Sequence, residues 1–283
     1  MTVPAEQGPG PQAAHDAHTA RRFSGLDRLY GPLPAQAVRL AHVVVVGVGG
    51  VGSWATEALA RSGVGRITLV DMDHVSESNI NRQVHALTPT IGMAKITAMA
   101  ERIALINPHC QVVGLDAFVD ADNWLGLLPA DADAVVDACD QVIAKTAMAH
   151  WARQAAAHFI TVGAAGGKRH AHAVTVSDLS ACTHDPLLAQ VRYRLRKFHG
   201  APKEGKKIGI SCVTSPEPTT APAELSMGPS IAAVAARTDS TLNCHGYGSL
   251  VTVTATFGLC AAGWVMDKLS QAPLKPPAND AII

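Results

Sequence analysis

Charged residues are scarce in this chain and balanced in sign. It has 23 lysines and arginines and 23 aspartates and glutamates among 283 residues, so its formal net charge is zero. A protein without net charge attracts a polyanion such as a nucleic acid only through a local basic patch. Apolar residues make up 48% of the chain, which argues against a disordered protein and is typical of a soluble one with a large buried parallel sheet.

The sequence also lacks paired cysteines. None of its six cysteines belongs to a CxxC pair. We therefore expect no zinc site, and the scattered thiols favour a reducing compartment and a cytoplasmic location. The cysteines are Cys110, Cys139, Cys182, Cys212, Cys244 and Cys260.

Apolar runs long enough to cross a membrane are missing too. The longest uncharged stretch, residues 250–266, falls just short of the roughly 18 to 20 residues that a span needs. Its TVTAT part alternates like a strand, so we expect a buried strand followed by a packed helix. Peripheral membrane contact through these residues is the less favoured alternative.

Both ends of the chain are poor in residues that build a core. Residues 1–20 contain no apolar run, and residues 271–283 are rich in proline. We expect both segments to be tails, and the first to be no targeting peptide.

Strand and helix patterns alternate between these ends. Short β-branched runs predict strands at residues 43–46, 66–70, 112–115, 134–137 and 159–162. Helical patterns at residues 50–62, 92–107, 121–128 and 141–157 separate them. This order predicts an α/β fold with a doubly wound, mostly parallel, Rossmann-like sheet.

The pattern changes near residue 180. HAVTVSDLS, at residues 172–180, alternates like a strand, and a basic helix is predicted at residues 186–198. Residues 214–229 are rich in proline and threonine and predict a mobile loop. We therefore divide the chain into a core, residues 21–180, and a C-terminal extension with antiparallel strands, residues 181–270.

A glycine motif follows the first predicted strand. Gly47, Gly49 and Gly52 have the GxGxxG spacing and open a helix, where backbone N–H groups and the helix N-terminus approach phosphate. Asp71 ends the second strand, about twenty residues after the glycine motif. At this spacing a carboxylate accepts hydrogen bonds from ribose hydroxyls. The motif predicts a nucleotide site without naming the nucleotide.

Polar and cationic residues follow the second strand. Asn79, Arg82 and Gln83 lie just after its carboxyl end, and Lys95 comes near the start of the next helix. A nicotinamide enzyme seldom needs several cations around the phosphates. A nucleoside triphosphate that loses pyrophosphate needs several cations, because charge develops on the transferred group. The residues favour ATP chemistry, and an NAD-binding oxidoreductase or sensor remains the rival from another class.

The fourth strand ends in two carboxylates, Asp137 and Asp140. A carboxylate at this edge of the sheet suits Mg²⁺ bridging the phosphates. Asp140 also stands where it would cap the helix predicted from residue 141. We favour the metal role.

These motifs together resemble the ubiquitin-activating-enzyme superfamily, which includes the ThiF-like adenylating enzymes. GVGGVGSWATEALARSGVG, DMDHVSESNINRQ, GMAK and DACDQ carry the resemblance, in this order. It implies that residues 21–180 bind ATP and adenylate a carboxylate, with Arg82, Lys95 and Asp140 (at Mg²⁺) as catalytic residues. The implied nucleotide-binding residues are Gly47, Gly49, Gly50, Gly52, Asp71, Asp73, Asn79, Arg82, Gln83 and Lys95.

The resemblance also implies a homodimer in which an arginine near the N-terminus reaches the partner's site. RRFSGLDRLYG offers Arg28 and, as the second choice, Arg22. The form of this segment departs from the RYxRQ of the sulfur-transfer members.

RFSGLDRLYG, the GAAGG loop, DPLLAQVRYRLRK, SCVTSPEP and VTVTATFG resemble one branch of the superfamily, the dehydratases that act on threonylcarbamoyladenosine in tRNA. That branch adenylates the threonine carboxylate with ATP and closes an oxazolone ring as AMP leaves. The alternative is adenylation of the C-terminus of a small ubiquitin-like or sulfur-carrier protein. Sulfur-transfer proteins are further possible partners.

A basic segment offers a surface for tRNA. Residues 192–207 hold seven lysines or arginines against one glutamate, an excess that neutralises several phosphates, although a solvated helix face has the same composition. The residues of the predicted tRNA patch are Lys168, Arg169, Arg192, Arg194, Arg196 and Lys197.

Three further residues invite a chemical role. Cys212 is a possible thiol nucleophile, but an acyl-adenylate that cyclises on itself needs no thiolate, so a structural or substrate-lining role is favoured. His170 and His172 have the spacing of metal ligands, and we expect them to be exposed residues at the start of a strand.

Overall fold

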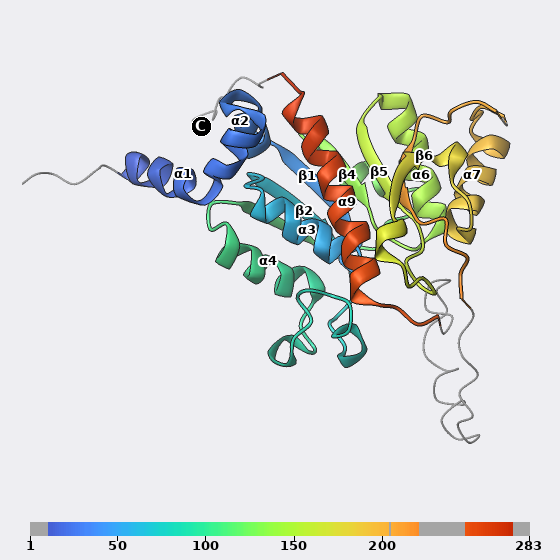
Figure 1. The fold of residues 1–283 in the computed structure, drawn as a ribbon, viewed down its shortest axis with the longest axis horizontal. Helices are drawn as coiled ribbons and strands as arrows, with labels where there is room; N and C mark the ends of the chain where they lie inside the picture. Colours follow the sequence, from blue (N-terminus) through green and yellow to red (C-terminus); the bar gives the residue numbers. More distant parts are fainter. Residues whose placement is uncertain (1–10, 204, 221–246, 274–283) are drawn as a thin grey trace, which may run out of the picture.

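The computed structural model describes residues 11–203, 205–220 and 247–273 and shows an α/β protein built on one sheet (Figure 1). The seven strands have the order β3-β2-β1-β4-β5-β7-β6. Neighbouring strands are parallel except β6 and β7, which are antiparallel. This confirms the predicted fold class. The strands are β1 His42–Val46, β2 Arg66–Val70, β3 Gln111–Leu115, β4 Ala134–Asp137, β5 His158–Val162, β6 Thr175–Asp178 and β7 Ser211–Thr214.

Helices cover both faces of the sheet (Figure 1). Helices α3, α4 and α9 contribute to the cluster of buried side chains on one face, and α6 and α7 contribute to the cluster on the other. The described helices are α1 Pro11–Tyr30, α2 Pro32–Leu40, α3 Gly52–Arg61, α4 Lys95–Ile106, α5 Trp124–Leu127, α6 Val142–Ala155, α7 Pro186–Phe198 and α9 Val251–Ser270.

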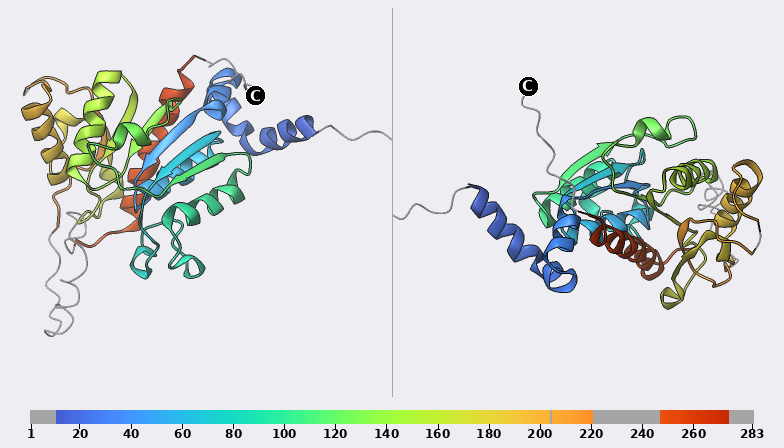
Figure 2. Two further views of the ribbon diagram at one scale, coloured as in Figure 1. Left: turned by 180° about the vertical axis from the view of Figure 1, so that it is seen from behind. Right: turned by 90° about the horizontal axis from the view of Figure 1, so that it is seen from above.

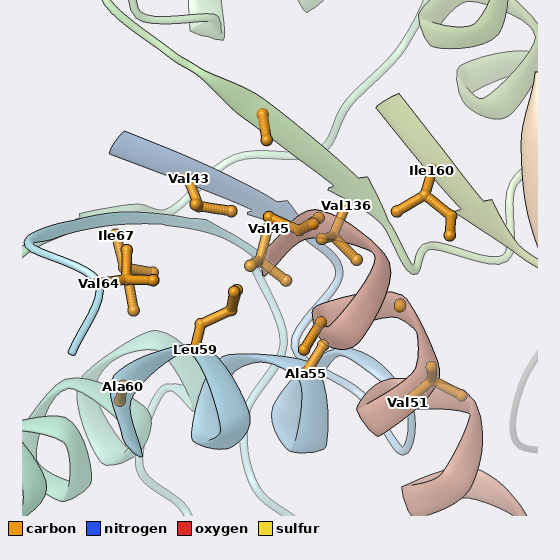
Figure 3. Close-up of a cluster of buried hydrophobic side chains, with 14 of the residues drawn as sticks. Val43, Val45, Val51, Ala55, Leu59, Ala60, Val64, Ile67, Val136 and Ile160 are labelled. Carbon is orange, nitrogen blue, oxygen red and sulfur yellow. The ribbon is translucent and has the colours of Figure 1, made fainter. Parts of the chain in front are cut away.

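The burial of strand β1 on both faces explains its continuous run of valines. Val43 and Val45 pack on the face that carries α3 and α9, and Val44 packs on the opposite face with α6. All three side chains are fully buried. Figure 3 shows Val43 and Val45 facing Leu59 of α3. A strand covered on both faces has no polar side to alternate with.

The C-terminal apolar stretch is one helix, and the predicted strand within it is wrong. Helix α9 runs from Val251 to Ser270 beside α3 (Figure 1). Val253, Phe257 and Ala261 recur every fourth residue and are fully buried, so helical burial overrides the local TVTAT alternation. No helix in the described parts of the chain is both long and apolar enough to cross a membrane.

The sheet crosses the predicted boundary between core and extension. Strand β7, which the sequence analysis did not identify, lies between β5 and β6 and pairs with both. Residues on either side of residue 180 therefore build one sheet. Thr214 ends β7, residues 215–220 contain no helix or strand, and the remainder of the predicted loop, 221–229, lies outside the described residues.

The N-terminal segment is more ordered than expected. Residues 11–20 form the first half of α1, so the predicted tail is wrong from residue 11, and residues 1–10 lie outside the described ranges. Phe23 on the second half of α1 is buried, and its ring lies against Gly63. The rest of α1 extends away from the sheet (Figure 2).

Candidate functional site

A cavity of about 430 Å³ lies at the carboxyl ends of the central strands. Its wall is made by the loops that follow β1 to β5 and by the start of α9. Most of the predicted nucleotide-binding residues line it, although they come from four separate segments of the chain. Those that do are Gly47, Gly49, Gly50, Asp71, Asp73, Arg82, Gln83 and Lys95, and the predicted magnesium-binding residue Asp140 lines the cavity as well.

The glycine loop turns sharply between β1 and α3. Gly47 has a φ of +85°, and a Cβ there would lie 2.8 Å from the Cys139 backbone nitrogen. A Cβ on Gly52 would collide with the Gly47 carbonyl oxygen. Gly52 does not line the cavity, and its part is to let α3 start close against the strand.

Asp71 connects the glycine loop to the second strand. Its Oδ2 accepts a hydrogen bond of 2.6 Å from Val48 N, and its Oδ1 accepts one of 2.8 Å from Asp73 N. Burial raises the pKa of Asp71, while the Lys95 ammonium opposes this shift. The carboxylate keeps lone pairs for ribose hydroxyls, because each oxygen has one backbone partner.

Lys95 points into the cavity from the first residue of α4. Its side chain is 8% exposed, and Nζ forms an ion pair of 2.6 Å with Asp73 Oδ2. Asp73 lies two residues beyond Asp71. A bound phosphate can therefore pair with the buried ammonium of Lys95 in place of the more exposed Asp73 carboxylate.

Arg82 stands on the wall formed by the loop after β2. Its Nη1 donates to Ser78 O at 2.6 Å and to Asn81 Oδ1 at 3.0 Å, and its carbonyl oxygen accepts from Trp54 Nε1 of α3 at 3.0 Å. The backbone of this arginine is therefore tied to the helix of the glycine motif. Its guanidinium keeps further N–H donors for a ligand.

The two other polar residues of this loop have different positions. Asn79 is buried and does not line the cavity; its Oδ1 accepts from Ser76 N at 3.0 Å and closes the turn η1, Glu77–Asn79. Gln83 lines the cavity, and its buried Oε1 has no protein hydrogen-bond partner within the described residues. A buried amide oxygen without a partner calls for a donor from a ligand or water.

Asp140 faces the cavity and does not cap α6. The N-cap of that helix is Gln141, without a side-chain capping bond, and Asp140 Oδ1 accepts a hydrogen bond of 3.4 Å from Gln141 Nε2. The alternative prediction of a capping role is thus wrong. The carboxylate fits Mg²⁺ that is held mainly by ligand phosphates, because such ions need only one or two protein carboxylates.

A buried ion pair that the sequence did not reveal supports this part of the wall. Lys145 and Asp137 are both fully buried, with Nζ 3.1 Å from Oδ2. Lys145 also donates to Thr161 Oγ1 at 3.0 Å and to Val162 O at 2.9 Å. The pair ties the ends of β4 and β5 together beneath the cavity. A lysine at an unremarkable helix position gave no signal of this role.

Two aromatic residues of the cavity were also missed. Phe118 follows β3 and is 51% exposed, and Tyr247, just before α9, is 40% exposed. Neither belongs to a motif, and only the fold brings them to the wall.

The predicted tRNA patch needs one correction. Lys168 is 2% exposed, and its ammonium donates to the carbonyl oxygens of His184, Ser215 and Glu217, so it ties three loops together instead of meeting phosphate. Burial lowers the pKa of this lysine. Arg169 remains exposed.

The other patch residues lie on α7. Lys197 is exposed and lies over the rings of Tyr193 and Phe198 at 5.4 and 5.1 Å from their centroids, and both rings are more than half exposed. Arg192 donates to two carbonyl oxygens and Arg196 to one, and both are partly buried, as is Arg194. The helix presents cations beside exposed aromatic rings.

Cys212 lies in the middle of β7, fully buried and outside the cavity. The neighbouring Cys182 sulfur and burial together raise the pKa of Cys212 far above its ordinary value. A thiol in this state is neither accessible nor a thiolate. The geometry favours a structural role.

The remaining residues singled out from the sequence lie away from the cavity. His170 and His172 are exposed, with ring centroids 5.5 Å apart, and the described residues contain no group of three possible metal ligands. Arg22 donates to Ile106 O, and Arg28 donates to Ser24 Oγ at 3.4 Å. Neither arginine lines the cavity of its own chain.

Known proteins are similar to this chain in sequence and fold. The ThiF family model matches residues 26–281. The tRNA threonylcarbamoyladenosine dehydratases of Haemophilus influenzae and Escherichia coli are each 42% identical to the chain, over 88% of its length and 93% of theirs. A crystal structure of the Escherichia coli enzyme in complex with ATP superposes with a TM-score of 0.77, at 41% identity over 88% of this chain and 94% of that one. The chain belongs to the ThiF family.

Proposed function

We propose that this protein is an ATP-dependent dehydratase that converts threonylcarbamoyladenosine in tRNA to its cyclic oxazolone form. A carboxylate oxygen of the threonine moiety attacks the α-phosphorus of ATP, and pyrophosphate leaves. The carbamoyl oxygen then attacks the activated carbonyl carbon, the ring closes with loss of a proton, and AMP leaves with one former carboxylate oxygen. The tRNA loses the elements of water.

One observation carries this proposal. The relatives that bear this name match 88% of the chain and 93% of their own length, so the similarity extends far beyond the glycine motif. A shared nucleotide site alone would favour no particular acceptor.

The cavity residues supply electrostatic stabilisation. Lys95 and Arg82 approach the region over the glycine loop, where negative charge grows on the α-phosphoryl group and on the departing pyrophosphate. Asp71 holds the ribose through the lone pairs that its backbone bonds leave unused. Preformed charges of this kind need little rearrangement during the reaction.

Asp140 would hold Mg²⁺ together with the phosphates. When bound, the ion neutralises charge on the phosphate oxygens. The residue fits this part because its carboxylate lines the cavity and is not used as a helix cap.

The tRNA would bind across α7 and the loop that bears Arg169. The exposed Lys197 beside the rings of Tyr193 and Phe198 matches a ligand that has both phosphates and bases. Binding through such a surface weakens steeply with salt. An enzyme acting on tRNA works where tRNA is, and we propose a cytoplasmic location.

We also propose a homodimer in which Arg28, or Arg22 as the second choice, reaches the partner's cavity. Helix α1 carries both residues in its second half, and its first half extends away from the sheet (Figure 2). An arm of this kind suits contact with a second subunit.

The experiment measures AMP release and nucleoside mass together. The protein receives ATP and Mg²⁺ with one of three substrates: threonylcarbamoylated tRNA, the same tRNA without the modification, or a small protein ending in diglycine. We expect AMP and a product lighter by one water only with the modified tRNA. AMP formed only with the diglycine protein would overturn the proposal in favour of protein adenylation, and tight NADH binding without ATP turnover would favour an oxidoreductase.

A further inference from the structure

The two exposed aromatic residues of the cavity are Phe118 and Tyr247, the only aromatic side chains among its described lining residues. An aromatic ring that is half exposed in a cavity wall offers a flat apolar face. Nucleobases stack on such faces, and the contact tolerates any base because every base has a π-face. Each residue is therefore placed to receive a base.

The strand order puts these residues at opposite ends of the cavity. Phe118 lies beyond the end of β3, and Tyr247 lies beside Gly166, which follows β5. Three strands, β2, β1 and β4, separate β3 from β5 (Figure 1). With about 4.8 Å between neighbouring strands, the two ends are about 19 Å apart.

The phosphate-binding groups lie between the two ends. The glycine loop follows β1, and Asp140 follows β4. Asp71 ends the intervening strand β2 on the Phe118 side, so a nucleotide held by that carboxylate has its base toward Phe118 and its α-phosphate at the centre. The Tyr247 half then faces the α-phosphate from the other side.

We propose that the cavity holds two purines end to end and that Tyr247 stacks on the nucleobase of the tRNA substrate. This inference rests on the proposed function, since the substrate is an adenine whose N6 substituent ends in the carboxylate to be activated. With the base on Tyr247, the substituent extends toward the centre and meets the α-phosphorus there.

The segment that carries Tyr247 is tied to both sides of the cavity. Gly167 N donates to Gly248 O at 2.8 Å, and Asn81 Nδ2 donates to Ser249 O at 3.1 Å. Asn81 Oδ1 in turn accepts from Arg82 Nη1 at 3.0 Å. A base that stacks on Tyr247 therefore contacts a segment whose hydrogen bonds reach the arginine of the reaction centre.

A reciprocal pair of variants tests the inference. Tyr247→Leu removes the ring at one end of the cavity, and Phe118→Leu removes it at the other. The readouts are the KM for threonylcarbamoylated tRNA and the Kd for ATP, measured by calorimetry without tRNA. Thermal melting of both variants checks that they fold, and Tyr247→Phe keeps the ring as the matched control.

We expect Tyr247→Leu to raise the KM for tRNA by about 5- to 100-fold, the range of one base-stacking contact, with the Kd for ATP unchanged. Phe118→Leu should raise the Kd for ATP and leave the KM for tRNA unchanged. Tyr247→Phe should match the wild type in both the KM for tRNA and the Kd for ATP. An unchanged KM in folded Tyr247→Leu, with active wild type, would overturn this inference alone. A wild type that binds ATP but forms no cyclic product would overturn the proposed function and this inference with it.

Discussion

Lys95 and Asp73 form an ion pair of 2.6 Å at the wall of the nucleotide cavity, with the lysine buried and the aspartate largely exposed. A phosphate entering the cavity meets this ammonium as a preformed partner. We predict that Lys95→Ala lowers kcat/KM by about 100-fold or more, the usual cost of removing one group that stabilises transition-state charge. Steady-state kinetics measure the loss. Lys268→Ala, at the far end of α9 and away from the cavity lining, is the control and should match the wild type.

The position of Asp140 leads to a prediction about how activity depends on Mg²⁺. Asp140→Asn keeps the shape of the side chain but removes its charge, so we expect the Mg²⁺ concentration for half-maximal activity to rise by about 10- to 100-fold. Titration of activity with Mg²⁺ at fixed ATP measures this change. Asp122→Asn, at an exposed site outside the cavity lining, should leave the titration unchanged. The same curve for Asp140→Asn and the wild type would refute the assignment.

Cys212 allows a prediction of retained activity. The thiol is fully buried in β7, so Cys212→Ala should keep kcat within about threefold of the wild type. The free energy of unfolding should fall by about 1 to 2 kcal/mol, because the smaller side chain leaves a gap in the core. Urea denaturation and steady-state turnover measure the two effects. A variant that folds but is inactive would mean that the thiol takes part in the reaction.

His85 gives the protein a predicted sensitivity to acid. It is 1% exposed, neither ring nitrogen has a hydrogen-bond partner among the described residues, and burial lowers its pKa to about 4. Between pH 6.5 and pH 4 the unfolded chain binds a proton at this histidine and the folded protein does not. The free energy of unfolding therefore falls as the pH drops through this window, by about 3 kcal/mol in all.

The test compares urea denaturation of His85→Gln with that of the wild type at several pH values from 7 to 4. The variant lacks the titrating ring, so its free energy of unfolding should fall less than that of the wild type as the pH drops. His172→Gln replaces an exposed histidine and should follow the wild type. A constant difference between His85→Gln and the wild type across this range would contradict the prediction.

Much of the fold was predictable because buried strands and amphipathic helices leave periodic patterns. The run of valines at β1 and the helix Pro186–Phe198 were identified within a residue. Strand β7, Ser211–Thr214, was missed because it runs directly into a proline-rich stretch, which hides its short apolar pattern. Helix α9 was misjudged at its start because five residues that alternate fit both periods until tertiary packing chooses one.

The candidate site was predictable where chemistry follows a motif. Asp71, Arg82 and Lys95 meet in one cavity, as the spacing of the motifs implied. Lys168 was wrongly predicted to lie on the surface because it stands next to an arginine in the sequence. In the structure three backbone carbonyl oxygens bind its ammonium in the interior. Tyr247 gave no signal at all, since the fold brings it to the wall through the hydrogen bonds of Gly248 with Gly167 and of Ser249 with Asn81.

The fate of one oxygen atom tests the central claim most directly. Threonylcarbamoylated tRNA labelled with ¹⁸O in the threonine carboxylate is turned over with unlabelled ATP, and the AMP is analysed by mass spectrometry. Adenylation of the carboxylate predicts one ¹⁸O in each AMP and a cyclic product that keeps the other. AMP without label, formed alongside the cyclic product, would show that the carboxylate is not adenylated and would overturn the proposed mechanism.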